Sequence, residues 1–416
     1  MENNNQHWSR RKFINILTGT GTLLLLNPLL GSWDTITSPR IMKRAGQTMG
    51  IDTHNHIDVP LDGTTSPEMN NAFTEYMKVS GLSAIVMTFA VDYQRLTEEG
   101  QAYSRFLNGI GAMDKLLENN NIKRALDYSA LEQAYQKKQP IVIQSVEGGH
   151  FLEGKIERLQ IAYDRGLRHL GLLHDNDASV PLGDIYTNPP KWGGLTDFGA
   201  KVIQECNRLG ILIDLTHCSN DTINAALKVS SKPIMISHTG LDTQLGSNAT
   251  MAKMMQPRLI SKVQAKIVAN AGGVIGAWTH LADSSLEYAQ NIRALVDVVG
   301  IDHVCIGTDT KLTSPYRPPF NPNSQSQGKL DDKKEDIPNE RKNSEKNIQS
   351  TPPNIPKEPN GERIGERTNL IWKDQKQGFY FEVVDALIKT GFSDSDIAKI
   401  GGGNFARVFD EATKIN

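Results

Sequence analysis

The chain has 416 residues, of which 38% are apolar and 22% are charged; this mixture can bury a large core and excludes a fully disordered chain. Lys and Arg total 45 and Asp and Glu total 47, so the formal net charge is -2, and a chain this close to neutrality lacks the positive field that holds nucleic acid or an anionic membrane. The three cysteines lie far apart without CxxC spacing, which argues against a disulfide scaffold and a cysteine-cluster zinc site.

The N-terminal segment, residues 1–48, is predicted to be a signal segment and linker. Two adjacent arginines, Arg10 and Arg11, precede an apolar stretch from Ile16 to Leu30, which is the pattern of a twin-arginine export signal. An ordinary signal peptide or a short membrane anchor is the alternative, but Pro28 and two glycines make the stretch weakly hydrophobic for a membrane span. We therefore expect export to the periplasm by the twin-arginine pathway, with membrane contact only through this segment if it is uncleaved.

From Met49 onward, eight short β-branched or apolar segments recur, most of them separated by stretches rich in helix formers. The predicted strands are Gly50–Asp58, Ser83–Ala90, Pro140–Glu147, Leu167–His174, Ile211–His217, Pro233–His238, Gly273–Trp278 and His303–Asp309. Helices are expected between them, for example over Thr196–Leu209, Asp221–Val229 and Ile260–Asn270. This alternation predicts an α/β protein, a (β/α)8 TIM barrel over residues 49–416. A doubly wound open sheet is the alternative, but no glycine-rich dinucleotide motif follows the first strand.

A polar stretch follows the eighth predicted strand. Residues 313–367 are dense in Pro, Asn, Ser, Lys and Glu and nearly lack large apolar side chains, so they cannot bury enough surface to order themselves. We expect a disordered low-complexity insertion, either a solvated loop without a function or a lid over the site. Leu370–Lys389 and Ser393–Phe409 are then expected to form closing helices.

Side chains that can bind metal occur where the predicted strands end, which is where barrel enzymes place their sites. These candidates come from four strands and are His54, His56, Glu147, His217 and His238. Four imidazoles and a carboxylate suit zinc or a similar divalent metal. The remaining histidines near strand starts and in loops are interpreted as structural.

Glu147 is the candidate for a carboxylate that bridges two metals and supports a shared hydroxide. Two glycines follow it and give the backbone room. Some barrel hydrolases use a modified lysine at the end of the fourth strand instead, but this strand ends in Leu172-Leu173-His174. The absence of a lysine there favours Glu147.

Several further segments are specific in their order and spacing. They are Glu147-Gly148-Gly149, Gly194–Gly199, Ile213–Ser219, Pro233–His238 and Gly401–Phe405. Together with the first-strand motif they resemble the membrane (renal) dipeptidase family of zinc peptidases across nearly everything after Met49. The resemblance implies a binuclear zinc barrel that hydrolyses dipeptides, with relatives that act on D-amino-acid or related amide substrates.

The resemblance also implies the metal ligands, with Glu147 bridging two zinc ions and His217 and His238 completing the second site. The first site departs from the family pattern Asp-Gly-His-Asn-Asp, because this chain has Asp52-Thr53-His54-Asn55-His56. One alignment makes His54 and His56 the ligands, with histidine in place of aspartate; a shifted alignment uses His56 and Asp58. We prefer the first, which keeps the flanking Asp and Asn, and both remain open. A neutral ligand in place of a carboxylate makes the site more positive.

Three further residues match positions that handle substrate in the family. His174 resembles the histidine that contacts the scissile carbonyl, and Asp309 the carboxylate that binds the substrate amino group and shuttles a proton. Arg258 resembles the arginine that clamps the substrate carboxylate, a task suited to a bidentate donor; a solvated cation at a helix start is the alternative.

The function predicted is a metal-dependent dipeptidase that uses a metal-bridging hydroxide, including on dipeptides with D-residues. Another metal-dependent amidohydrolase, acting on a cyclic amide, lactone or N-acyl substrate, is one alternative, and a non-catalytic binding protein on a retained barrel is the other. The partner expected is a small-molecule dipeptide and not nucleic acid, and a homodimer is considered as the assembly.

Overall fold

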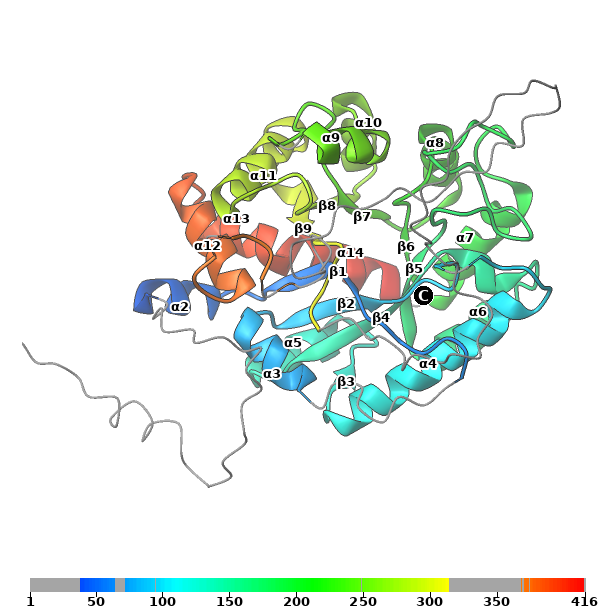
Figure 1. Cartoon of the computed structure of the whole chain (residues 1–416), viewed down its shortest axis with the longest axis horizontal. Helices are drawn as coiled ribbons and strands as arrows, with labels where there is room; N and C mark the ends of the chain where they lie inside the picture. The colour runs from blue at the N-terminus through cyan, green and yellow to red at the C-terminus, as the bar shows by residue number, and fades with distance from the viewer. Residues whose placement is uncertain are drawn as a thin grey trace, which may run out of the picture. The chain divides into compact units, whose positions relative to one another are not determined.

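Parallel strands at the predicted positions form the centre of the fold (Figure 1). The computed structural model describes residues 38–63, 72–93, 95–247, 249–313, 368, 370–373 and 375–414. The main strands are β1 (Ile51–His56), β2 (Ala84–Thr88), β4 (Ile141–Glu147), β5 (Leu167–Gly171), β6 (Leu212–Asp214), β7 (Met235–Thr239), β8 (Val274–Ala277) and β9 (Val304–Ile306). The short strand β3 (Lys123–Arg124) pairs with the start of β4. The predicted barrel of α/β type is confirmed.

The barrel closes through the last strand segment. β9 pairs with β8, and the same segment continues as β10 (Thr310–Lys311), which pairs in parallel with β1. Beside it, the Thr53 hydroxyl donates to the Ile306 carbonyl oxygen at 2.8 Å. The first and last predicted strands therefore lie next to each other, as closure requires.

Helices cover the outside of the strands (Figure 1). Those between strands are α3 (Phe73–Ser80), α4 (Gln101–Asn119), α5 (Tyr128–Gln136), α6 (Arg158–Asp164), α7 (Asp197–Leu209), α8 (Asn220–Val229), α9 (Ala249–Met255), α10 (Lys262–Asn270) and α11 (Ser285–Val299). In α7 the Thr196 hydroxyl accepts a hydrogen bond from Gly199 N at 3.0 Å, so it caps the helix. Val202, Ile203 and Cys206 are buried on one face, which is the amphipathic spacing that the sequence shows.

The amino end of the barrel is closed by the C-terminal helices. α13 (Asp394–Ala398), the π-helical turn η4 (Lys399–Gly403) and α14 (Asn404–Thr413) follow one another. Phe405 and Phe409 of α14 belong to the same buried cluster as the strand residues Ile51 and Ile143. Because α14 fills this end, the opposite end, at the carboxyl termini of the strands, stays available for a site.

The two predicted C-terminal helices differ from the structure. The helix predicted over Leu370–Lys389 begins only at Phe379 (α12, Phe379–Lys389). A Cβ at Gly378 would lie 1.8 Å from Val79 O, so the chain approaches α3 too closely there for any larger residue. The helical region predicted over Ser393–Phe409 is divided by η4, in which three of the five residues are glycines.

Two predicted segments fall largely outside the described residues. Of residues 1–48, the structure describes the end, where α2 (Pro39–Ala45) buries Ala45 and the Thr48 hydroxyl lies 2.6 Å from the Tyr380 hydroxyl. The folded part thus begins before Met49. Of the predicted insertion, only Thr313 is described. In the described part of the chain, no helix has the length and apolar character needed to cross a bilayer.

Candidate metal centre

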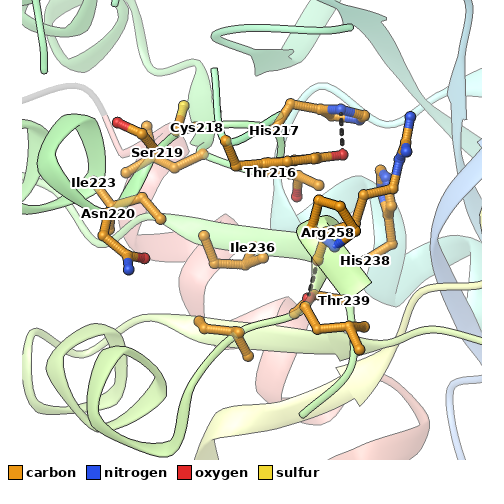
Figure 2. Close-up of a pocket in the computed structure, with 15 residues that line it drawn as sticks. Thr216, His217, Cys218, Ser219, Asn220, Ile223, Ile236, His238, Thr239 and Arg258 are labelled. Carbon is orange, nitrogen blue, oxygen red and sulfur yellow. Dashed lines mark hydrogen bonds between the residues drawn. The ribbon is translucent and has the colours of Figure 1, made fainter. Parts of the chain in front are cut away.

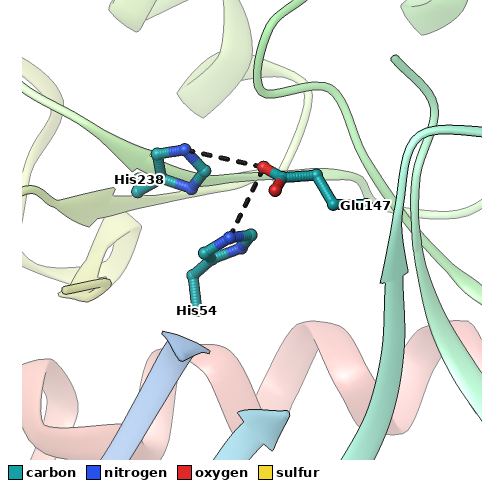
Figure 3. Close-up of side chains that lie close together, drawn as sticks. All are labelled: His54, Glu147 and His238. Carbon is teal, nitrogen blue, oxygen red and sulfur yellow. Dashed lines mark ion pairs between the residues drawn. The ribbon is translucent and has the colours of Figure 1, made fainter. Parts of the chain in front are cut away.

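Glu147 lies at the centre of a group of polar side chains at the carboxyl ends of the strands. It ends β4 and is 2% exposed. Its Oε1 lies 2.9 Å from His217 Nε2, 3.4 Å from His54 Nε2 and 3.9 Å from His238 Nε2. Figure 3 shows His54 and His238 pointing at this carboxylate from two different strands. The structure therefore brings together side chains from β1, β4 and β7 and from the loop after β6.

The second oxygen of this carboxylate faces two more imidazoles. Glu147 Oε2 lies 3.4 Å from His174 Nε2 and 3.5 Å from His56 Nε2. It is buried and has no hydrogen-bond partner, which is costly for a polar atom unless something else binds it. The next residue, Gly148, has a φ of 85°, and a Cβ there would lie 2.5 Å from His150 Nδ1. Glycine is therefore required at this position.

The two histidines of β1 lie against each other and against Asp309. His54 Nε2 and His56 Nε2 are 3.2 Å apart, and His56 Nε2 is 3.0 Å from Asp309 Oδ1. The flanking carboxylates point elsewhere: Asp52 accepts hydrogen bonds from Thr308, and Asp58 pairs with Lys311 at 3.0 Å. His54, and not Asp58, is thus the residue that the structure brings to His56.

Two residues of the site have unusual backbone conformations. His217 has a φ of 68° and Asp309 a φ of 56°, both in the left-handed region that costs a non-glycine residue about 1 kcal/mol or more. Such strain persists where the surrounding structure imposes it, and it is common at functional sites. The His217 side chain faces Glu147, and the Asp309 side chain faces His56.

The charges of the cluster suit metal binding. Burial raises the pKa of Glu147, but His174, His54 and His217 outweigh it and hold this pKa well below its usual range. Burial, together with His54, lowers the pKa of His238 to about 3. Burial lowers the pKa of His217 and of His54, but Glu147 outweighs it and raises the first to about 9 and the second above its usual value. A metal ion can bind the ionised carboxylate and the neutral His238 directly, whereas at His54 and His217 it displaces a proton.

The described residues offer three groups of donor atoms to a metal, and each group lies within 4.8 Å. The groups are His54–Glu147–His238, His54–His56–Asp309 and Glu147–His174–His217. Nitrogen and oxygen donors at such distances, and the unpartnered Glu147 Oε2, fit divalent zinc or a similar metal. His217 and His238, predicted to share a site, fall in different groups that have Glu147 in common.

Arg258 lies at the edge of this centre, in a pocket that it shares with His217 and His238. Figure 2 shows these three residues together on one side of the pocket. Arg258 follows α9 in the short turn η2 (Gln256–Arg258), and its Nη2 donates to Asp175 Oδ2 at 2.8 Å. The other oxygen of Asp175 lies 3.2 Å from His217 Nδ1. Arg258 is thus connected to the centre through Asp175. The alternative interpretation, a solvated cation at a helix start, does not account for this contact.

Four contacting residues were not predicted from the sequence. Asp92 Oδ1 lies 2.7 Å from His174 Nδ1, and the Tyr93 hydroxyl lies 2.7 Å from His56 Nδ1. The Tyr186 hydroxyl lies 2.9 Å from His217 Nδ1, and Asp175 contacts the same ring nitrogen. Asp92 and Asp175 follow the ends of β2 and β5, so the strand-end rule that found the other residues could have found these two.

Comparisons with known proteins identify the family and the fold of this chain. The family model described as membrane dipeptidase (peptidase family M19) matches residues 41–315. Over 102 residues the chain is 39% identical to Dipeptidase 3 of Mus musculus, a match that spans 23% of this chain and only 20% of that protein.

Solved structures share the fold. PvdM of Pseudomonas aeruginosa, described as a probable dipeptidase, has a TM-score of 0.64 and 17% identity, covering 91% of this chain and 100% of its own. A metallopeptidase of Rhodobacter sphaeroides, solved with a phosphinate mimic of the dipeptide L-Ala-D-Ala, has a TM-score of 0.62 and 14% identity, covering 87% and 99%.

Proposed function

Because the chain belongs to the membrane dipeptidase family, peptidase family M19, we propose that it is a metal-dependent dipeptidase that hydrolyses the amide bond of dipeptides. This family was predicted from the sequence, and the prediction is confirmed. The observation that carries the proposal is the convergence of His54, His217 and His238 on Glu147 at the barrel mouth. A relative of the same fold accepts a mimic of L-Ala-D-Ala, which supports dipeptides with a D-residue as substrates.

We propose zinc as the metal and two ions as the number, with Glu147 shared between them. His54 and His56 would hold one ion, and His217 and His238 the other. When bound, such a metal supplies a Lewis acid that polarises the scissile carbonyl and lowers the pKa of water.

His174 is placed to stabilise negative charge on the substrate. Its Nδ1 faces Asp92 at 2.7 Å, and its Nε2 points to the centre, 3.4 Å from Glu147 Oε2. Burial lowers the pKa of His174, but Asp92 and Glu147 outweigh it and raise this pKa well above the usual value. With both ring nitrogens protonated, Nε2–H can donate to the carbonyl oxygen as that oxygen becomes an oxyanion.

Asp309 and Arg258 act on the two ends of the substrate in this proposal. The Asp309 carboxylate binds the substrate amino group, takes a proton from the attacking water and delivers it to the leaving amine. Arg258 binds the substrate carboxylate in place of Asp175, because a planar guanidinium can form two parallel hydrogen bonds with it. Because Arg258 needs a carboxylate to bind, the substrates are restricted to those that have one near the scissile bond.

Another metal-dependent amidohydrolase activity is the second candidate, favoured by the contact between His54 and His56 at 3.2 Å. The two candidates predict different substrates. A dipeptidase needs a free amine and a free carboxylate, whereas an amidohydrolase for cyclic or N-acyl substrates does not.

The test is an assay of the purified protein on dipeptides, before and after chelation and after zinc is restored. We expect activity to disappear on chelation and to return with zinc, and to fall strongly when the dipeptide is N-acetylated or C-amidated. Activity that is indifferent to chelation, in a protein without bound metal, would contradict a metallopeptidase.

We further propose that residues 1–37, which lie outside the described residues, direct export by the twin-arginine pathway. The support is the adjacent pair Arg10 and Arg11 before a weakly apolar stretch. Replacing both arginines by lysine should retain the protein in the cytoplasm on cell fractionation, and unchanged export would contradict the proposal.

A homodimer is proposed as the assembly, and light scattering measures its mass.

A further inference from the structure

The β1 side of the centre is short of negative charge for a pair of divalent ions. At the position where the family pattern has aspartate, this chain has His56, which is neutral when it binds a metal. Among the five ligands carried over by resemblance, Glu147 is then the only carboxylate. Two divalent cations in a buried site with a single negative charge repel each other strongly, because the low dielectric screens them little.

Asp309 places a second carboxylate at this side. Its Oδ1 lies 3.0 Å from His56 Nε2 and 3.8 Å from His54 Nε2, and the two imidazole nitrogens are 3.2 Å apart. Ligand atoms that bind one zinc at about 2.0–2.2 Å lie about 3–3.5 Å from one another in a tetrahedral site. Two of the three separations fall in this range and the third, 3.8 Å between His54 Nε2 and Asp309 Oδ1, exceeds it by about 0.3 Å, so a small shift of Asp309 would bring all three atoms onto one cation.

The orientation of Asp309 is set by the residues around it. Its backbone N donates to His54 O at 3.0 Å, which holds the left-handed backbone of residue 309 against β1. Trp278 Nε1 donates to Oδ2 at 3.1 Å. Since Oδ2 is engaged by Trp278, Oδ1 is the oxygen left to face the two histidines.

His56 is oriented in the same way. The Tyr93 hydroxyl lies 2.7 Å from Nδ1 of this ring and 3.3 Å from Nε2, so Nδ1 is its nearer partner. When Nδ1–H donates to that hydroxyl, the lone pair lies on Nε2, the atom that faces Asp309 and His54. A partner on the remote ring nitrogen is typical of histidines that bind metal.

We propose that Asp309 is itself a metal ligand and forms, with His54 and His56, the first metal position next to the shared Glu147. Asp309 thereby supplies the carboxylate charge that histidine at position 56 has removed. The inference rests on the proposed function, since it requires a metal centre, and goes beyond it by adding a ligand.

The test measures zinc affinity and stoichiometry of the metal-free full-length protein by calorimetry and elemental analysis. We compare Asp309→Asn, His56→Asp, the double variant His56→Asp/Asp309→Asn and the control Asp302→Asn, whose carboxylate is exposed at the opposite end of the barrel and pairs with Lys399. Loss of a residue that only orients a ligand lowers metal affinity about 10–100-fold, so loss of a ligand should lower it at least as much.

We expect wild type and Asp302→Asn to bind two equivalents of zinc, and Asp309→Asn to bind one equivalent tightly and the second at least tenfold more weakly. The double variant should regain the second equivalent, because it returns a carboxylate to position 56. If Asp309→Asn lost zinc because it failed to fold, the double variant would not regain the second equivalent. Thermal unfolding of the metal-free proteins checks the fold independently.

Two outcomes would overturn the inference in different ways. If Asp309→Asn keeps both equivalents at wild-type affinity and loses only turnover, Asp309 serves substrate alone and the proposed dipeptidase stands. If wild type binds no zinc or similar divalent metal, the proposed function fails together with the inference.

Discussion

At the scale of single residues, the centre is a set of imidazoles whose remote nitrogens each have a partner. His174 contacts Asp92, and His217 contacts Tyr186 and Asp175. These partners fix which ring nitrogen faces Glu147, and they restrict ring rotation. Such a site is rigid before a ligand arrives, which is what positioning of reacting groups requires.

Asp92 is predicted to be a positioning residue that acts through His174. Asp92→Asn removes the negative charge that raises the pKa of His174, while its amide oxygen can still accept from Nδ1–H. We expect kcat to fall about 10–100-fold, with little change in KM and with bound zinc unchanged. Steady-state kinetics and metal analysis check this, with the exposed Asp394→Asn as the matched control; an unchanged kcat would contradict the role.

At the scale of elements, the turn η4 shows why a glycine run follows α13. A Cβ at Gly402 would lie 2.1 Å from Met49 O and 2.8 Å from Ile51 Cγ1. The turn therefore touches the start of β1 with its backbone, and Asn404 Nδ2 donates to the carbonyl oxygen of Val304, the first residue of β9, at 2.8 Å. Glycines 401–403 in the sequence thus serve the closure of the amino end of the barrel and not the catalytic end.

Gly402→Ala is predicted to destabilise the fold by about 1–3 kcal/mol, because the methyl group overpacks against backbone that cannot move freely. Gly111→Ala is the matched control, since a Cβ at that position in α4 meets nothing within 4 Å; alanine in a helix should stabilise it by up to about 1 kcal/mol. Urea unfolding of both variants measures the difference. Equal free energies of unfolding for the two variants would show that a methyl group at position 402 does not disturb the contact with β1.

At the scale of the whole molecule, closure and catalysis use opposite ends of the barrel. α14 fills the amino end, whereas all the candidate ligands lie at the carboxyl end. The chain also returns to the barrel where it left it, because Thr368 N donates to Lys311 O at 2.8 Å and Asn55 Nδ2 donates to Thr368 Oγ1. The barrel wall beside β1 is therefore complete without the residues between 313 and 368.

Replacing residues 314–367 by a linker of about six residues is predicted to preserve the fold. Both ends of the segment are fixed next to each other at β10, and a shorter loop costs less entropy to close, by about 2 kcal/mol for this change in length. We expect the free energy of unfolding in urea to stay equal or to rise, with zinc content unchanged. A loss of cooperative unfolding would show that these residues are needed for the fold.

The strand positions and the identity of the clustered residues could be predicted from the sequence, because both follow from local pattern. β-branched runs define strands, and strand-end residues of a parallel barrel meet at one end whatever lies between them. His54, His56 and Glu147 were found in this way, whereas Asp309 was carried over from the resemblance to the family. The start of α12 was misplaced, because Gly378 is fixed by contact with Val79 from a distant helix.

The sequence by itself determined the barrel, the family and the candidate metal ligands at its mouth, since periodicity and motif order are properties of the chain alone. Only the tertiary structure decided how these side chains are arranged: that His56 meets His54 and Asp309 while Asp58 turns to Lys311, and that Asp92 and Tyr93 hold the rings. Those contacts join residues far apart in the chain, and their geometry depends on strand register and backbone torsion, which no local pattern encodes.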